Sequence, residues 1–324
     1  MSNNRVIVTG GSGFIGTNII AYFLGIGWDV INFDVAEPRN ADQLPIWEKV
    51  DLLDRCQLIK KTQEVKPSTF LHFGARTDLD EKRNLGGYSA NIEGVINVLD
   101  AILSTSSIKR AVFASSQMVC TLGYIPKDDH DYQPSNLYGQ SKVLMELIIR
   151  SAGNLDVIWT IVRPTSIWGP WFDIPYKNLF QAIGRNIYFH AGETSPLKQW
   201  GFAGNAVYQI WKIIQAPKEN VDGKTFYLAD YSPVCLEDFT NKIQARLGAK
   251  PIRTLPAIVL KNAARLGDAA QFIGWKNPPL TSFRYQNIVT TELRDLTNLE
   301  EIVGPLPYTL EQGIDITVRW LEGH

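Results

Sequence analysis

Two stretches of this sequence combine residue types at spacings that could perform redox chemistry. Tyr138 and Lys142 stand four residues apart, so a helix would place both on one face. A tyrosine has a pKa of about 10, and a nearby ammonium group favours the phenolate, which can take a proton from a hydroxyl group. Far upstream, residues 9–16 read Thr-Gly-Gly-Ser-Gly-Phe-Ile-Gly, a glycine-rich turn after an apolar stretch. Together they predict a dinucleotide-dependent redox site that works through Tyr138.

The glycine-rich turn matches the G-x-G-x-x-G pattern at residues 11–16. Small residues let backbone N–H groups approach phosphate oxygens at a helix start, and Gly16 would let that helix pack closely on the strand. A plain tight turn is the alternative interpretation, because this pattern alone gives false matches. The order of strand, turn and helix favours a cofactor site, with contacts expected from Gly10, Gly13, Phe14, Ile15 and Gly16.

Asp34 ends the next expected strand. Its carboxylate would accept hydrogen bonds from the ribose hydroxyls of the adenosine and would repel a 2′-phosphate, so NAD is favoured over NADP. Arg39 weakens this preference, because an arginine can accommodate the phosphate. A solvated strand end is the alternative interpretation of Asp34.

Ser116 stands at the end of another expected parallel strand, where such sheets bind ligands. Its hydroxyl could hold the reacting oxygen while Tyr138 transfers the proton, and Lys142 could bind the nicotinamide ribose. The alternatives are a surface Tyr–Lys pair on an amphipathic helix and a strand-end hydroxyl that satisfies backbone groups.

Strands and helices alternate through the first half of the chain, which predicts a doubly wound α/β sheet of the Rossmann type with a smaller mixed C-terminal substrate domain. We expect an NAD-binding domain at residues 1–174, to which the segment 203–231 returns, and a substrate domain at 175–324. The expected strands are 5–9, 29–34, 69–73, 110–116, 156–163 and 225–228. The expected helices are 14–24, 90–103, 136–152, 176–185, 204–215, 236–247 and 256–272.

Composition excludes several classes of protein. The 324 residues are 45% hydrophobic and 20% charged, with a formal net charge of −1, which is typical of a soluble globular protein and not of a nucleic-acid binder. The three cysteines are widely separated, as in a cytoplasmic protein. We expect no signal peptide and no membrane partner. With four histidines and no ligand spacing, we also expect no metal.

These motifs resemble the extended short-chain dehydrogenase/reductases, in particular the NAD-dependent nucleotide-sugar epimerase/dehydratase group. The resemblance rests on the glycine-rich turn, Asp34, the catalytic trio and further short motifs between residues 51 and 170. It implies Ser116, Tyr138 and Lys142 as the catalytic set, and a homodimer formed through helices 90–103 and 136–152. It also implies cofactor contacts at Asp51, Leu52, Phe73, Gly74, Ala75, Asn91, Ser115, Tyr138, Lys142 and Pro164, and a substrate contact at Asn178.

Arg76 follows the strand that precedes residues 73–75, so it is a second substrate candidate, with a loop hydrogen-bond network as the alternative. The sequence departs from the family pattern in two places. Gln117 and Met118 replace the Asp-Glu pair of the sugar 4,6-dehydratases, which argues against dehydration. Residues 199–206 lack the usual charges near the substrate. Cations that could replace them, although each is more readily a solvated surface charge, are Lys177, Arg185, Lys198 and Arg284.

Three functions follow from these observations. The first is an NAD-dependent epimerase or reductase of a nucleotide sugar, with Tyr138 as acid and base. The second is a dehydrogenase or reductase of a non-nucleotide alcohol or ketone, favoured by the missing charges and by three tryptophans, Trp168, Trp171 and Trp200. The third is a non-catalytic NAD(H)-binding regulator, against which the intact catalytic set argues.

Overall fold

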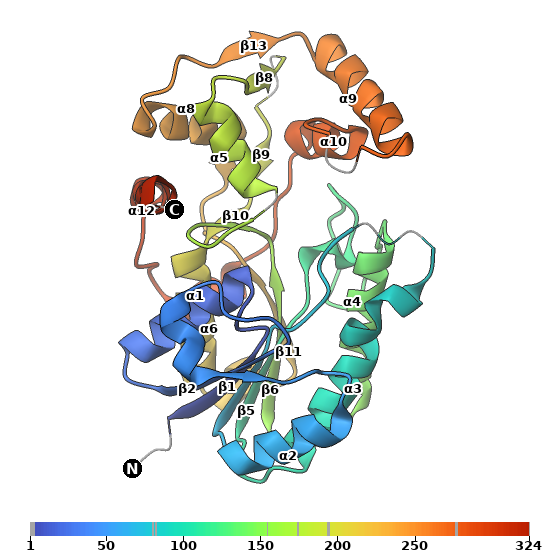
Figure 1. Ribbon diagram of the computed structural model, residues 1–324, viewed down its shortest axis with the longest axis vertical. Helices are drawn as coiled ribbons and strands as arrows, with labels where there is room; N and C mark the ends of the chain where they lie inside the picture. Colours follow the sequence, from blue (N-terminus) through green and yellow to red (C-terminus); the bar gives the residue numbers. More distant parts are fainter. Residues whose placement is uncertain are drawn as a thin grey trace.

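One parallel sheet organises the N-terminal part of the molecule (Figure 1). The computed structural model describes residues 4–79, 81, 83–153, 155–173, 175–192, 195–275 and 278–323. Within these residues, seven parallel strands form a sheet in the order β3-β2-β1-β4-β5-β6-β11. The strands are β1 (Arg5–Thr9), β2 (Asp29–Asp34), β3 (Trp47–Lys49), β4 (Thr69–His72), β5 (Arg110–Ala114), β6 (Ile158–Pro164) and β11 (Lys224–Leu228).

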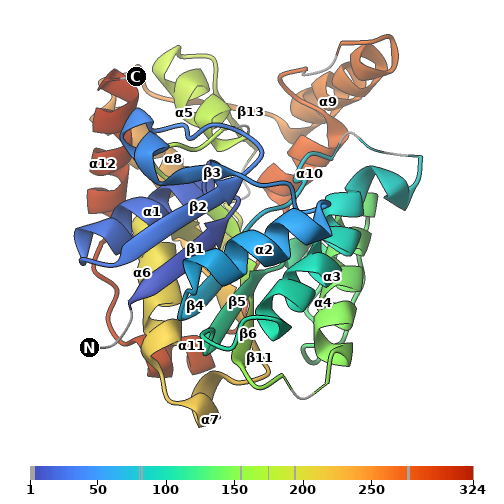
Figure 2. The same ribbon diagram turned by 60° about the horizontal axis from the view of Figure 1, so that its bottom comes forward.

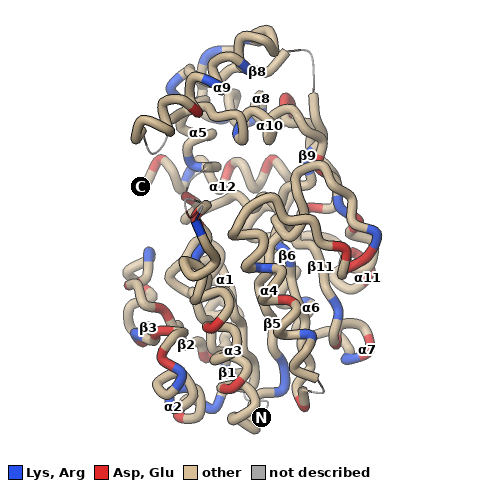
Figure 3. The backbone as a smooth tube through the Cα atoms, turned by 90° about the vertical axis from the view of Figure 1, so that its right-hand side faces the viewer, with Lys and Arg blue, Asp and Glu red and all other residues tan. Residues whose placement is uncertain are grey.

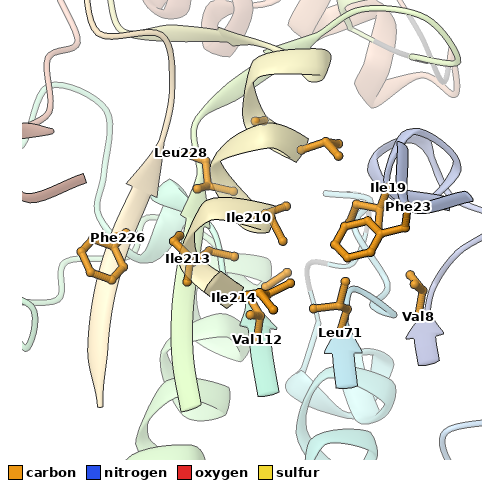
Figure 4. Close-up of a cluster of buried hydrophobic side chains, with 14 of the residues drawn as sticks. Val8, Ile19, Phe23, Leu71, Val112, Ile210, Ile213, Ile214, Phe226 and Leu228 are labelled. Carbon is orange, nitrogen blue, oxygen red and sulfur yellow. The ribbon is translucent and has the colours of Figure 1, made fainter. Parts of the chain in front are cut away.

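Helices cover both faces of this sheet (Figure 2). Side chains alternate along each strand, so Val6 and Val8 of β1 pack toward α1 (Phe14–Gly25) and α6 (Ala203–Gln215), as part of the cluster in Figure 4. Ile7 packs on the other face. That face is covered by α2 (Arg55–Val65), α3 (Ser89–Leu103) and α4 (Leu137–Ser151). The expected doubly wound α/β sheet is therefore confirmed.

The C-terminal half forms a second lobe of short paired strands and helices above the carboxyl ends of the sheet (Figure 1). Its strand pairs are β10 (Trp200–Phe202) with β7 (Ser166–Trp168), β12 (Val234–Cys235) with β9 (Leu197–Lys198), and β13 (Arg253–Leu255) with β8 (Phe189–Ala191). Its helices are α5 (Tyr176–Gly184), α8 (Leu236–Arg246), α9 (Ala257–Phe272), α10 (Ser282–Val289) and α12 (Leu310–Gly323). Trp168, Phe180 and Phe239 are central to its aromatic core.

Four elements return from the second half to the large sheet. α6 buries Ile210, Ile213 and Ile214 against it, and α7 (Lys218–Val221) and α11 (Thr297–Val303) pack beside β11. β11 pairs with β6 along its whole length, from Lys224 opposite Thr160 to Leu228 opposite Pro164. The strand expected at residues 225–228 is therefore present and lies at the edge of the sheet.

The predicted strands and helices are all present, and their ends differ from the prediction by at most two residues. The strand expected at 110–116 ends at Ala114, because the Ser116 hydroxyl caps the short helix η3 (Gln117–Val119) by accepting a hydrogen bond from the Met118 N–H. Basic and acidic residues are interspersed along the chain (Figure 3). Among the helices that the structure describes, none has the length and apolar content needed to cross a membrane.

Candidate active site

The glycine-rich turn lies where the strand order reverses, between β1 and its neighbours β2 and β4. Ligands of open α/β sheets bind at the carboxyl ends of the strands at this point. Gly10 follows β1 with a φ of +70°, and a Cβ on it would lie 2.5 Å from the backbone nitrogen of Gly74, which follows β4. The two strand ends therefore meet backbone to backbone, which only a residue without a side chain permits at Gly10.

Gly16 and Gly13 are required for different reasons. A Cβ on Gly16 would lie 2.2 Å from the Gly10 carbonyl oxygen, so α1 packs directly on the turn. A Cβ on Gly13 would meet one protein atom within 4 Å, the same oxygen at 3.2 Å. Gly13 precedes the first residue of α1 and makes no side-chain cap. Because the N–H groups of a first helical turn have no intrahelical partner, those of Phe14, Ile15 and Gly16 suit a pyrophosphate.

Alanine substitutions separate these two roles. We expect Gly16→Ala to lower the free energy of unfolding by about 1–3 kcal/mol, because its Cβ would displace backbone atoms. Gly13→Ala should leave thermal unfolding of the cofactor-free protein nearly unchanged but weaken NAD binding about tenfold or more. Calorimetry and NAD titration measure both effects. Gly25→Ala, where nothing lies within 4 Å of the added Cβ, is the control. Equal NAD affinity in Gly13→Ala and wild type would contradict the assigned role.

Asp34, the last residue of β2, holds the glycine-rich turn in place through hydrogen bonds. Its two carboxylate oxygens accept the backbone N–H groups of Ser12 and Ala36, each at 3.0 Å. Burial raises the pKa of Asp34, while these hydrogen bonds and Arg39 oppose the rise. Each carboxylate oxygen can accept a second hydrogen bond, so Asp34 can hold the turn and still bind ribose hydroxyls. Arg39 donates to the Trp171 carbonyl at 3.0 Å, which commits part of its guanidinium to the other lobe.

Tyr138, Lys142 and Ser116 come from two elements that touch through their backbones. Asn136 caps α4 by accepting the Gly139 N–H at 2.8 Å. A Cβ on Gly139 would lie 2.2 Å from the Met118 carbonyl oxygen. The first turn of α4 is therefore pressed against η3, directly after Ser116. This contact brings the phenol of Tyr138 close to the Ser116 hydroxyl, which has a lowering effect on the pKa of Tyr138.

Burial dominates the electrostatics of this set. It raises the pKa of Tyr138 to about 12, against the lowering effect of the Ser116 hydrogen bond. Burial also lowers the pKa of Lys142 to about 8, while Glu146 counteracts it. The Lys142 ammonium donates to the Ala114 carbonyl at 2.8 Å. Desolvation of Tyr138 outweighs the other effects on its pKa in this structure, so the expectation that Lys142 favours the phenolate stays a prediction.

The loop after β4 is held by Asn91 of α3. The Asn91 side chain accepts the Arg76 N–H at 2.8 Å and donates to the Arg76 carbonyl at 3.0 Å and to Ser141 of α4 at 2.9 Å. Asn91 therefore ties residues 73–76, expected beside the cofactor, to the catalytic helix. The Arg76 guanidinium donates to both carboxylate oxygens of Asp78 and to the Gly87 carbonyl. The loop hydrogen-bond network that the sequence analysis gives as the alternative interpretation of Arg76 is therefore present.

The other expected cofactor contacts lie along the same rim. Leu52 packs against Gly74, with its Cδ1 2.9 Å from the position of a Cβ there. The Asp51 carboxylate accepts the Leu53 N–H at 2.9 Å. Ser115 is buried after β5, and its N–H donates to the Val162 carbonyl of β6, whose last residue is Pro164. The structure thus brings the expected cofactor residues to the carboxyl edge of one sheet, and their contacts with NAD stay predictions.

Sequence reasoning missed a buried ion pair behind the catalytic helix. Glu146 lies one helical turn beyond Lys142, and both its oxygens accept from the Arg163 guanidinium, at 2.9 and 2.8 Å. The side chains of Glu146 and Arg163 have no exposed surface. Burial disfavours a charged Glu146, yet Arg163 keeps its pKa below the usual value. Tyr138, Lys142 and Glu146 follow one another at intervals of four residues, and this spacing is the sequence signal from which the position of Glu146 behind the catalytic pair could have been predicted.

Two of the four cations proposed from the sequence are committed to backbone carbonyls, whereas Lys177 is half-buried and Arg185 is exposed. Lys198 is buried and donates to the carbonyls of Asn287 and Thr290, and the Arg284 guanidinium donates to the carbonyl of Pro278. Asn178 lies exposed on α5. No contact tests substrate binding by Asn178 or Arg76 in the part of the chain that the structure describes, so both stay predictions.

Gln117 occupies the position at which a dehydratase would carry an acid. Its amide nitrogen donates to the Ser166 hydroxyl at 3.3 Å, and its amide oxygen is buried with no hydrogen-bond partner among the described residues. A neutral amide cannot protonate a leaving hydroxyl group. In the same described part of the chain, no group of His, Cys, Asp and Glu side chains could hold a metal ion.

Comparison with known proteins agrees with this geometry. The model of the "NAD dependent epimerase/dehydratase family" matches residues 6–229. N-acetyl-alpha-D-glucosaminyl-diphospho-ditrans,octacis-undecaprenol 4-epimerase of Escherichia coli O157:H7 is 25% identical, over 98% of this chain and 95% of its own. A decarboxylating sterol-4-alpha-carboxylate 3-dehydrogenase of Saccharomyces cerevisiae is 24% identical, over 98% of each chain.

Solved structures share the fold across the whole chain. UDP-glucose 4-epimerase of Thermotoga maritima, solved with UDP-glucose, superimposes with a TM-score of 0.75 at 17% identity, over 98% of this chain and 99% of its own. The family model covers the glycine turn, the catalytic trio and β11 together, and it confirms the resemblance drawn from the motifs. This chain therefore belongs to the NAD-dependent epimerase/dehydratase family, and NAD is its cofactor.

Proposed function

We propose that this protein is an NAD-dependent epimerase that oxidises and then re-reduces one hydroxyl-bearing carbon of a sugar diphosphate. The observation that carries the proposal is the buried set of Tyr138, Ser116 and Lys142 beside the glycine turn at the carboxyl edge of the sheet. NAD, when bound there, would supply the hydride acceptor and donor for that carbon. A site that only sensed NAD(H) would not need a phenol and a hydroxyl positioned for proton transfer.

Each member of the set has one task in this proposal. Ser116 holds the reacting oxygen, and Tyr138 takes its proton during oxidation and gives it back during reduction. Lys142, whose ammonium is held at the end of β5 by the Ala114 carbonyl, binds the nicotinamide ribose and stabilises the phenolate. Gln117 and Met118 supply no acid or base for the loss of water, so the reaction stops at epimerisation.

We further propose that the sugar diphosphate is carried by a lipid and not by a nucleoside. Two relatives that align over nearly the whole chain have a lipid in their names, an undecaprenol and a sterol. The segment 199–206 lacks the charges usual at a nucleotide diphosphate, and Lys198 and Arg284 are committed to backbone carbonyls. A diphosphate normally requires such cations whether a lipid or a nucleoside carries it, so the names of the two relatives, and not the missing charges, favour the lipid carrier.

A net dehydrogenase of a lipid alcohol is the second candidate, because the sterol dehydrogenase aligns as fully as the epimerase. The two differ in the fate of the hydride. An epimerase returns it and leaves the NADH concentration unchanged, whereas a dehydrogenase forms NADH in proportion to product.

The test uses purified protein whose bound NAD has been measured by native mass spectrometry. It is incubated with polyprenyl-diphosphate sugars, UDP-sugars and sterols that carry deuterium on the reacting carbon. Epimerised lipid-linked sugar that keeps its deuterium, without accumulated NADH, supports the first proposal. Stoichiometric deuterated NADH supports the second candidate, and turnover of UDP-sugars alone refutes the lipid carrier. No hydride exchange with any substrate would refute catalysis and revive the regulator.

A further inference from the structure

The helical hairpin formed by α9 and α10 (residues 257–289) exposes many large apolar side chains. In α9, all of whose residues are described, Ala264 is the one buried residue. Seven large hydrophobic side chains of the described part of this hairpin are exposed: Ile258 (62%), Val259 (47%), Leu266 (72%), Phe272 (92%), Ile273 (83%), Trp275 (55%) and Phe283 (49%). A surface helix normally turns its apolar stripe toward the core, so α9 is oriented the opposite way.

The inward face of α9 is already occupied. A Cβ on Gly267 would lie within bonding distance of the Leu280 carbonyl oxygen, so the start of α10 packs directly on this face. Asp268, also on this side, accepts the Ser282 N–H at 3.0 Å. The Arg284 guanidinium donates to the carbonyls of Pro278 and Pro279. Contacts between α9 and the start of α10 thus hold the hairpin together, and these contacts do not use its exposed apolar side chains.

The outward face is apolar with a basic flank. Ile258, Leu266 and Ile273 recur at steps of eight and seven residues, two helical turns each, and so lie on one face. Lys261 and Arg265, both exposed, stand one turn apart beside this face. The acid within α9, Asp268, is turned toward α10. An apolar face with Trp and Phe near one end and cations along its flank is the pattern of a helix that lies in a membrane interface.

The hairpin also borders the catalytic site. At the end of α10, the Cγ2 of Thr290 lies 3.0 Å from the position of a Cβ on Gly123, in the loop that follows η3. The Arg294 guanidinium, just beyond, donates to the Tyr124 carbonyl at 3.3 Å. Figure 1 shows α9 on the outer side of this junction, away from the sheet. A surface bound by α9 would therefore lie beside the opening of the site.

We propose that the outward face of α9, with the tip residues Phe272, Ile273 and Trp275, docks on a lipid bilayer that carries anionic headgroups. The proposal rests on the proposed function in one respect, because docking gives this site access to a substrate whose lipid stays in the membrane. Charge complementarity selects the bilayer as the occupant, since Lys261 and Arg265 suit anionic headgroups. A second copy of this chain that docked through the same face would bring Lys261 and Arg265 near their own counterparts, and these cations would find no anionic partner there.

This proposal departs from the sequence analysis, which expects no membrane partner on the ground that the chain lacks a spanning segment. A helix lying in the interface needs neither the length nor the uniform hydropathy of a span. The exposed apolar residues of α3 and α4, Ile96, Leu103 and Leu147, lie on other elements and are not part of the docking face.

The test is vesicle flotation of the full-length protein with bound NAD. Vesicles contain phosphatidylcholine alone or with about one-third phosphatidylglycerol, at low and high salt. We expect wild type to float with the anionic vesicles, and the variant Leu266→Ser/Phe272→Ser/Ile273→Ser to float about fivefold less or worse. The control Leu24→Ser/Ile26→Ser/Leu44→Ser replaces as many exposed apolar side chains of the other lobe, away from α3 and α4, and should float as wild type does.

Lys261→Gln/Arg265→Gln should remove the difference between anionic and neutral vesicles while unfolding at the wild-type temperature. Wild type that stays unbound, or a serine triple variant that floats normally, would overturn the proposal. So would a wild-type dimer that the triple variant converts to monomer without any vesicle binding, because a second copy would then cover the face. Epimerisation of a lipid-linked sugar by a protein that never binds vesicles would refute docking and leave the proposed function intact.

Discussion

Tyr138→Phe is expected to lower turnover about 10²–10⁴-fold, because it deletes the group that transfers the proton. The protein should keep its fold, since the aromatic ring stays packed near Tyr88, and the free energy of unfolding should change by about 1 kcal/mol at most. NAD should still be bound. Steady-state rates, native mass spectrometry and thermal unfolding of the same preparation measure the three quantities.

Tyr208→Phe is the matched control, because Tyr208 lies on α6, on the opposite face of the sheet from α4. It should be as active as wild type. If Tyr138→Phe were fully active, the proton would have another carrier and the proposed mechanism would be wrong. If it were inactive but also free of NAD, Tyr138 would be shown to act in cofactor binding.

The second large effect is expected at the buried ion pair. Arg163→Met leaves the buried Glu146 carboxylate with Tyr132 and the more distant Arg150, at 3.6 Å, as its partners, so it should cost up to about 3–5 kcal/mol of unfolding free energy. The loss includes the stacking of Arg163 between the rings of Tyr132 and Tyr227, at 5.5 and 5.4 Å from their centroids. Urea unfolding curves measure the effect.

The double variant Arg163→Met/Glu146→Leu should be less unstable than the sum of its single variants, because the two changes remove an interaction that both share. Lys60→Met is the control, since Lys60 and Glu64 form an exposed pair at 4.0 Å and such pairs contribute at most about 0.5 kcal/mol. Additive losses at Arg163 and Glu146 would show that the pair does not couple α4 to β6.

The sequence predicted the cofactor half of the site because its elements are local. A glycine turn, the acid at the end of the next strand and a Tyr–Lys pair within one helix each reveal their geometry through spacing alone. Burial does not follow from spacing, so the raised pKa of Tyr138 and the hydrogen bond from Lys142 to Ala114 could not be predicted. Asn91 was expected at the cofactor, but its amide joins two chain segments far apart in sequence.

Five helices were not predicted, namely α2, α7, α10, α11 and α12, and two of them illustrate different physical reasons. α2 buries Leu58 and Thr62 alone among its described residues, so its apolar periodicity is too weak to recognise. α12 does bury Ile314 and Val318 at helical spacing, but the Gly-Pro-Leu-Pro stretch at residues 304–307 interrupts the apolar pattern shortly before it. Helix α9 was predicted, but the exposure of its apolar side chains was not. The apolar pattern of a helix does not reveal whether its apolar face packs on a core or is exposed.

The position of β11 has a consequence for how this protein is made. While residues 1–174 emerge from the ribosome, β6 is an open edge of the sheet, and the face formed by Leu71 and Val112 lacks the isoleucines of α6 (Figure 4). Open edges and bare apolar faces are where nascent chains mispair and recruit chaperones. We propose that the N-terminal unit is discontinuous and stays incomplete during translation until Leu228 has left the exit tunnel. Ribosome stalling or truncation before that point should yield aggregation-prone chains.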